Sequence, residues 1–309
     1  IIEPGHTNKK VKTYVTIMKG CNNFCSYCVV PYVRGREASR NSNDILREIT
    51  NISLLGVKEV ILLGQNVNSY NKGRDDLSFP DLLKRINDID GIERIRFITS
   101  HPRDLSYELI ECFGSLNKLC ESIHLPFQAG SDRILKLMNR GYTREEYRKK
   151  ISLLRQRCPD IAITADCIVG FPGESEEDFE MTMDLVSNIR FDGLFSFVYS
   201  PRKNTVAATL PGAVPREVAL ERLARLQKSQ KSITLEYNKA MEGKVTEVLV
   251  EDRSKNSKEE LTGRTRTNKI VNFKGSADMF GSFAEVEIIK GYANSLKGEM
   301  RKSLGGHTC

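Results

Sequence analysis

Three cysteines near the start of the chain are the residues whose type and spacing best suit metal chemistry. Cys21, Cys25 and Cys28 lie within eight residues of one another. Three thiolates this close together can surround a single soft metal centre. A structural zinc ion takes four protein ligands, and no fourth cysteine or histidine follows at a ligand-like spacing. Only folding could bring His6 or His101 to the three thiols.

An iron–sulfur cube accounts for three ligands better than zinc does. Three thiolates can hold three of its four irons and leave the fourth iron open for another ligand. A zinc-containing RNA-binding protein without catalytic activity is the simpler alternative. A disulfide framework is typical of small secreted domains, not of a chain of 309 residues. We expect the scattered cysteines to be small buried apolar residues: Cys112, Cys120, Cys158 and Cys167.

The first two thirds of the chain alternate between short β-type runs and amphipathic helical segments. The predicted strands are 11–18, 59–63, 94–99, 122–125, 161–169 and 194–199. This alternation predicts an α/β fold with parallel strands, because each crossover must return to the same edge of the sheet. Periodicity does not distinguish an open sheet from part of a barrel. In both cases chemistry is expected in the loops after the strand ends, where the three cysteines lie.

The pattern changes after a proline-containing segment at 211–215. A long helix is predicted from Arg216 and ends at Gly243. Beyond it, apolar and charged residues alternate, which is typical of half-buried strands and predicts a small all-β barrel. We therefore divide the chain into an N-terminal linker or remnant at 1–10, an α/β domain with its linking helix at 11–240, and an all-β domain at 243–305.

Composition excludes several classes of protein. Hydrophobic residues make up 39% and charged residues 28% of the chain, as in ordinary globular proteins. The apolar runs are far shorter than the roughly 18 residues that a membrane span needs. We predict a cytoplasmic protein without membrane contact. The net charge of +7 weakly favours an anionic partner.

The residues around the cysteines resemble the radical S-adenosylmethionine superfamily, with the aromatic Tyr27 before the last cysteine. The segment 28–37 with Ser39 and Arg40 looks like the methylthiotransferase family within it. Further segments that agree with this family are 62–70, 124–132, 168–174 and 199–202. The segment 62–70 looks like the branch that acts on isopentenylated adenosine in tRNA. Residues 261–265 resemble the TRAM domain, an RNA-binding β-barrel.

The resemblance implies a partial (β/α)6 radical S-adenosylmethionine barrel followed by a small OB-like TRAM barrel. It implies a [4Fe-4S] cluster on the three cysteines, and S-adenosylmethionine as radical source and methyl donor. The implied reaction is methylthiolation at C2 of N6-isopentenyladenosine beside the tRNA anticodon, with flavodoxin or ferredoxin as electron donor. Related enzymes acting on threonylcarbamoyladenosine in tRNA or on a ribosomal protein are the alternatives.

The resemblance also implies which residues contact the cofactors. These are Tyr27, Gly64, Gln65, Gln128, Ser131, Ile168, Gly170 and Tyr199. The segment 63–65 corresponds to a Gly-Gly-Glu motif of the superfamily but lacks its Glu, and Asp166 stands where Gly is frequent. The simpler alternatives are that Gly170 forms only a turn and that Gln128 and Ser131 only cap the next helix.

Candidate RNA contacts lie in both predicted domains. In the all-β domain, Arg264, Arg266, Lys269 and Lys274 fall within eleven residues that contain no acidic residue, and Phe273 lies among them. Such a stripe can neutralise phosphates while the aromatic ring stacks on a base. In the other domain, the candidates Arg34 and Arg36 follow the cysteines. The alternative is a charged face that contacts only solvent.

One part of the family pattern has no counterpart here. Members of this family carry an upstream domain whose three further cysteines bind a second cluster that delivers sulfur. The chain starts at Ile1, and no such cysteines precede Cys21. We therefore expect a fragment that binds and cleaves S-adenosylmethionine but cannot insert sulfur.

Overall fold

The computed structural model describes residues 11–73, 75–255, 257 and 259–301. His6, Cys309, the segment 1–10 and the end of the predicted all-β domain at 302–305 lie outside the described residues.

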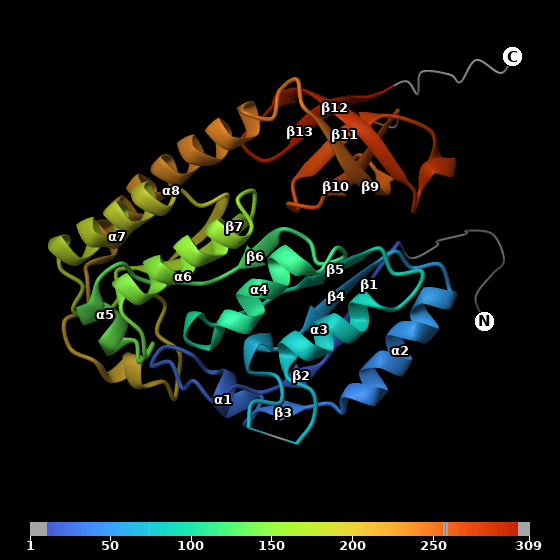
Figure 1. Ribbon diagram of the computed structural model, residues 1–309. Coiled ribbons are helices and arrows are strands. Elements are labelled where there is room, and N and C mark those ends of the chain that lie inside the picture. The colour runs from blue at the N-terminus through green and yellow to red at the C-terminus, as the bar shows by residue number, and fades with distance from the viewer. Residues whose placement is uncertain (1–10, 74, 256, 258, 302–309) are drawn as a thin grey trace, which may run out of the picture.

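Two three-stranded parallel sheets form the framework of the first domain (Figure 1). The first has the order β1 (Lys12–Thr16), β4 (Glu59–Leu63), β5 (Arg94–Phe97), and the second β6 (Ser122–His124), β7 (Ala162–Val169), β8 (Gly193–Val198). An isolated parallel bridge between Ile95 and Leu119 joins them. Among the described strands β1 and β8 do not pair with each other, so the six strands form a partial barrel. The predicted α/β fold is confirmed.

Helices between these strands cover one face of the sheets. They are α1 (Val30–Val33), α2 (Ser42–Leu54), α3 (Phe79–Asn87), α4 (Tyr107–Ser115), α5 (Asp132–Leu137), α6 (Arg144–Arg157) and α7 (Glu176–Ile189). Capping boxes at Thr143 and Ser175 begin α6 and α7 by satisfying backbone N–H groups that have no partner inside the helix. The short strands β2 (Met18–Lys19) and β3 (Ala38–Ser39) pair beside the cysteines.

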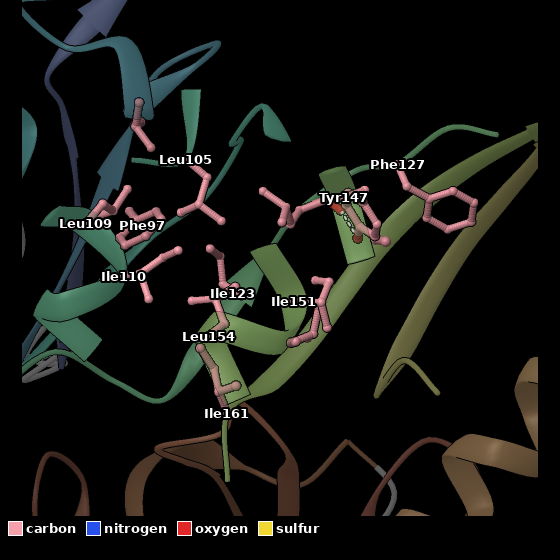
Figure 2. Packing of buried hydrophobic residues seen from close by; sticks show 14 of the residues in the cluster. Phe97, Leu105, Leu109, Ile110, Ile123, Phe127, Tyr147, Ile151, Leu154 and Ile161 are labelled. Atoms are coloured by element: carbon pink, nitrogen blue, oxygen red, sulfur yellow. Dashed lines mark hydrogen bonds between the residues drawn. The ribbon is translucent and has the colours of Figure 1, made fainter. Parts of the chain in front are cut away.

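The main core lies between the sheets and these helices. Phe97 of β5 packs with Leu109 and Ile110 of α4, while Ile151 and Leu154 of α6 lie nearby (Figure 2). Because successive side chains of a strand point to opposite faces, each strand also presents residues to the interior of the partial barrel. These interior residues decide which chemistry the barrel can host.

The 24-residue helix α8 (Arg216–Lys239) leads from the first domain to the second (Figure 1). There β9 (Val245–Arg253), β10 (Glu260–Thr265), β11 (Ile270–Lys274), β12 (Phe283–Gly291) and β13 (Leu296–Met300) close a barrel. Four 3-10 turns complete the described elements, at Val67–Ser69, Pro102–Asp104, Val206–Thr209 and Ala277–Met279. None of the helices described is long and apolar enough to cross a membrane.

The closed barrel docks at the amino ends of the parallel strands. Arg96 of β5 donates to the carbonyl oxygens of Thr265 (2.7 Å) and Arg266 (2.8 Å). Arg94 donates to the carbonyl oxygen of Arg264 at 2.7 Å. Buried guanidinium groups therefore tie β10 to the edge of the sheet opposite the carboxyl ends, where the loops that carry chemistry are expected.

A candidate metal centre at the carboxyl ends of the strands

The cysteine loop runs from β2 to α1 and is closed against the segment that follows α1. Gly20 has φ +76°, and a Cβ atom there would lie 2.1 Å from the carbonyl oxygen of Arg36. Its N–H donates to Oε1 of Gln65 at 2.7 Å. Only glycine accommodates both this left-handed conformation and the close backbone approach. The loop after β4 thus supports the loop that carries the cysteines.

The three cysteines form no disulfide, and Cys25 is the most deeply buried of them. Burial raises the pKa of Cys21 to about 11, and the neighbouring Cys25 and Cys28 raise it further. Burial also raises the pKa of the Cys28 thiol. Since thiols bind metals as thiolates, a metal centre here must displace protons. Within the described ranges, no three His, Cys, Asp or Glu residues are placed around the position of a single ion.

Arg140 supplies positive charge beside these sulfurs. It is buried, and its Nη1 lies 3.4 Å from Sγ of Cys25. Its Nη2 donates to the carbonyl oxygen of Pro126 at 2.7 Å, and its Nε donates to the hydroxyl of Tyr142 at 3.1 Å. These bonds fix the guanidinium group where it stabilises thiolate charge.

His101 approaches the same sulfur from a loop after β5. Its Nδ1 accepts a hydrogen bond from the backbone N–H of Arg103 at 3.1 Å, and its Nε2 lies 4.0 Å from Sγ of Cys25. Burial, followed by the charges of Arg140 and Arg103, lowers the pKa of His101 to about 2. The ring is therefore neutral, and the hydrogen bond at Nδ1 assigns its proton to Nε2. His101 faces Cys25 as a donor and is not a fourth ligand.

Three of the residues predicted to contact the cofactors lie at the cysteine loop. Tyr27 accepts a hydrogen bond from Arg140 at 3.4 Å, and Gln65 braces Gly20 as described above. A Cβ atom on Gly64 would lie 2.5 Å from Cγ of Met18, so the glycine there lets β4 end close to β2. The structure thus brings 64–65 to the cysteines, although 45 residues separate Gln65 from Gly20.

Several buried polar atoms near the carboxyl ends of the strands have no hydrogen-bond partner among the described residues. They include Oε1 of Gln128, the hydroxyl of Tyr199, and Oγ of Ser26 and Ser100. Buried polar groups nearly always find a hydrogen-bond partner, so this region suits a polar ligand. Together with three soft thiol donors, these atoms fit an iron–sulfur cluster that binds a polar organic cofactor.

Two other predicted residues, Ser131 and Gly170, have structural roles, whereas the cofactor contact of Ile168 stays a prediction. Ser131 caps α5 and donates to Asp178 at 2.6 Å, so its hydroxyl is already occupied and the capping interpretation describes it. Gly170 has φ +70°, and a Cβ atom there would lie 2.6 Å from Cβ of Ala219 in α8. Its glycine is needed for this close packing. Ile168 is half-buried, beside Phe197 in the register of β7 and β8.

The RNA-contact prediction for Phe273 is wrong. Its side chain is 0% exposed and belongs to the core of the closed barrel, so it cannot stack on a base. Alternation along β11 buries Val271 and Phe273 on the same face. The period-two pattern of the sequence already carried this signal.

Two cations of the basic stripe, Arg266 and Lys269, pair with the first domain. Arg266 pairs with Glu121 at 2.8 Å, and Lys269 pairs with Asp192 at 3.2 Å. Arg264 lies 3.6 Å from Glu251 of its own barrel. The side chains of Arg266 and Lys269 are therefore engaged in ion pairs between the domains. The RNA contacts predicted for this stripe stay a prediction.

Arg34 and Arg36 are exposed after α1, with Arg36 5.6 Å from the ring centroid of Phe24. Their contact with RNA stays a prediction. Sequence reasoning missed Arg140, because no local spacing relates it to cysteines 115 residues away.

Comparison with known proteins decides the family. The description "Radical SAM superfamily" belongs to the family model that matches residues 15–186, more than half of the chain. The chain belongs to the radical SAM superfamily. The TRAM domain model matches residues 239–300. Members of this superfamily use a [4Fe-4S] cluster and S-adenosylmethionine. The free thiols of Cys21, Cys25 and Cys28 are available to hold such a cluster, and their role as its ligands stays a prediction.

Curated relatives are similar over nearly all of this radical SAM chain. A protein of Syntrophus aciditrophicus is 60% identical over 95% of this chain and 64% of its own length. One of Moorella thermoacetica is 51% identical over 96% of this chain and 67% of its own length. Both are named tRNA-2-methylthio-N(6)-dimethylallyladenosine synthase. The chain thus spans about two thirds of the length of these relatives.

Solved structures share the fold at low sequence identity. The radical S-adenosylmethionine methyltransferase TsrM of Kitasatospora setae superposes with a TM-score of 0.53 and 18% identity, over 63% of this chain and 38% of that one. Coproporphyrinogen III oxidase of Escherichia coli superposes with a TM-score of 0.50 and 14% sequence identity, over 89% of this chain and 66% of that one. These likenesses confirm the predicted radical SAM fold.

Proposed function

We propose that this chain carries the radical and RNA-binding parts of an enzyme that methylthiolates tRNA. The substrate is N6-isopentenyladenosine next to the anticodon, and the methylthio group is added to C2 of its adenine. The observation that carries the proposal is the identity of 51–60% with synthases of this name over 95–96% of the chain. The TRAM domain supports an RNA substrate.

When bound, the cluster and S-adenosylmethionine supply the homolytic chemistry and the methyl group that this reaction needs. The residues of this chain prepare the site. Cys25 is buried away from water, Arg140 places positive charge beside its sulfur, and His101 directs an N–H toward it. Arg140 also ties the loop after β6 to the cysteine loop through the carbonyl oxygen of Pro126.

The partners follow from this chemistry. An electron donor such as flavodoxin or ferredoxin would reduce the cluster, and the anticodon loop of a tRNA would present the base. A base that reacts at a ring carbon must leave its stack, which a single-stranded loop permits at low cost. We place the reaction in the cytoplasm, where tRNA is modified.

We further propose that these 309 residues alone support cleavage of S-adenosylmethionine but not sulfur insertion. The test is to reconstitute this chain and the corresponding longer protein without oxygen, and to measure 5′-deoxyadenosine and methylthiolated tRNA for each. We expect 5′-deoxyadenosine from both proteins and product from the longer one only. Methylthiolated tRNA formed by the 309 residues alone would contradict this.

Substrate choice is tested on the longer protein with matched tRNAs. We expect product from tRNA that carries the isopentenyl group and none from the same tRNA without it. Product from tRNA carrying threonylcarbamoyladenosine, or from a ribosomal protein, would instead support the alternative branches of the family.

A further inference from the structure

A groove of about 550 Å³ lies between the two domains and is not part of the cysteine site. It follows β8, the edge strand of the second sheet, and is bounded by α8 and by the turn between β12 and β13. Its lining includes Phe195 and Phe197 of β8, Gln230 and Lys231 of α8, and Asn294 of the TRAM domain. Both domains therefore contribute to it.

Two phenylalanine rings are unusually exposed in this groove. Phe195 is 59% and Phe197 is 55% exposed. They lie two residues apart on one face of β8, where the strand geometry separates their Cα atoms by roughly 6.7 Å. This Cα separation is about twice the contact distance between carbon atoms. A flat ring can therefore lie between the two phenylalanine side chains or against either of them. Exposed apolar surface of this kind is typical of a binding site.

A buried acceptor without a partner lies in the same groove. The Nε2 atom of Gln230 donates to the carbonyl oxygen of Phe191 at 2.7 Å and to Thr234 at 2.9 Å, which fixes the side-chain amide. Its Oε1 has no hydrogen-bond partner within the described part of the chain, although Gln230 is only 6% exposed. An amide oxygen held in this way is placed to accept a hydrogen bond from an N–H or O–H group of a ligand. Ribose hydroxyls and exocyclic amines of bases offer such groups.

Phe195 also contacts a polar pair inside the partial barrel. Its ring centroid lies 6.0 Å from that of His124, in an edge-on arrangement. His124 in turn lies 3.3 Å from Asp166 through Nε2 and 3.0 Å from Thr164 through Nδ1. The aromatic wall of the groove thus adjoins donors and acceptors suited to the edge of a base.

We infer that this groove binds one unstacked nucleotide of a single-stranded RNA loop, with its base against Phe195 and Phe197. Flat apolar walls beside a few polar atoms are the features by which proteins hold splayed bases. The exposed ammonium group of Lys231 is placed to neutralise a phosphate at the rim. The source of the RNA, a tRNA anticodon loop, rests on the proposed function.

The inference is tested by RNA binding, without turnover. The probe is a fluorescent anticodon stem-loop containing N6-isopentenyladenosine, titrated by anisotropy with the reconstituted chain. Base–aromatic stacking contributes about 1–3 kcal/mol, so Phe195→Ala and Phe197→Ala should each weaken binding by about tenfold. The control is Tyr107→Ala, an aromatic residue of α4 that is 62% exposed outside the groove. Wild-type affinity in both phenylalanine variants would overturn the inference.

Hydrogen exchange of the unmutated chain gives a second readout that does not depend on how the variants fold. The stem-loop should slow exchange of backbone amides at 193–198, whereas a fully paired RNA duplex should not. Equal protection by the duplex, or no protection by the loop, would overturn the inference. If the groove binds the loop but the longer protein makes no methylthiolated tRNA, the proposed function fails and the groove assignment stands.

Discussion

The guanidinium group of Arg140 lies 3.4 Å from the sulfur of Cys25, although 115 residues separate them in the sequence. Arg140 is also in contact with Tyr27 and Tyr142, all within a buried cluster. One buried cation therefore links the cysteine loop to the loop after β6. Burial raises the pKa of the Cys28 thiol, and the positive charge of Arg140 opposes that rise.

Replacing Arg140 should impair iron binding. Arg140→Met keeps most of the volume but removes the charge and the 2.7 Å hydrogen bond to the carbonyl oxygen of Pro126, which costs about 1–3 kcal/mol. That oxygen keeps only the longer bond from the hydroxyl of Tyr142, at 3.4 Å. We expect less iron and sulfide after reconstitution and a lower Tm. Arg140→Lys should recover part of the iron, because it keeps the charge. Arg148→Met, at an exposed position of α6, is the control. Full iron content in Arg140→Met would show that this charge is dispensable.

The energetic effect of the close contact at Gly20 can be measured separately from that of its left-handed backbone conformation. Gly20→Ala and Gly35→Ala share nearly the same φ, +76° and +77°, but only Gly20 would bring its Cβ against the carbonyl oxygen of Arg36. Left-handed conformation costs roughly 1 kcal/mol in each variant, and the clash should add to it in Gly20→Ala alone. Urea unfolding of the two variants measures the difference. Equal losses of unfolding free energy would mean that the loop relaxes without cost.

The buried pair of Arg96 and Glu59 should hold the two domains together. Its atoms lie 3.0 Å apart, and Arg96 also donates to two carbonyl oxygens of the TRAM domain. Arg96→Met leaves the carboxylate of Glu59 buried and unpaired, with an expected loss of about 3–5 kcal/mol. Calorimetry should then resolve a separate transition for the TRAM domain.

Two variants test this account of the domain interface. Glu59→Met added to Arg96→Met should restore part of the stability, because no buried charge remains. Arg47→Met, which breaks an exposed pair with Asp44, should leave Tm unchanged. A single transition and an unchanged Tm in Arg96→Met would refute the proposed role of the pair.

Stability should fall in alkali through a buried thiol at the domain interface. Burial raises the pKa of Cys120 from 9.0 to about 11. The folded state thus favours the neutral thiol, and this contribution is complete below pH 9.0 and disappears as the pH rises through about 11. It amounts to at most about 2.7 kcal/mol. The unfolding free energy of Cys120→Ala should fall less steeply between these pH values than that of the unmutated chain. Parallel curves would contradict the prediction.

Local pattern predicted the framework of this fold well. The run 59–63 coincides with β4, and the strand–helix alternation was sufficient for parallel sheets. The spacing of Cys21, Cys25 and Cys28 located the candidate metal centre. These features depend on neighbours in the chain, where periodicity and spacing are informative.

What the sequence did not reveal depends on contacts between distant segments. His101 lies 76 residues from Cys25, and no spacing links them. The charges of Arg266 and Lys269 were evident, but their ion pairs with Glu121 and Asp192 depend on how the second barrel docks. A basic stripe in a sequence therefore indicates a negatively charged partner. It does not show whether that partner is RNA or a carboxylate of the same protein.

The length of helix α8 sets the distance between the two barrels. At 24 residues it spans about 36 Å, and each inserted residue would swing the TRAM domain by about 100° around its axis. One end is pinned where Arg222 pairs with Glu174 at 2.8 Å, and the other where Asn238 donates to the carbonyl oxygen of Tyr292. Adding or removing even one residue of this helix would move the TRAM side of the groove away from β8. We therefore expect substitutions along α8 to be tolerated during evolution far more readily than insertions.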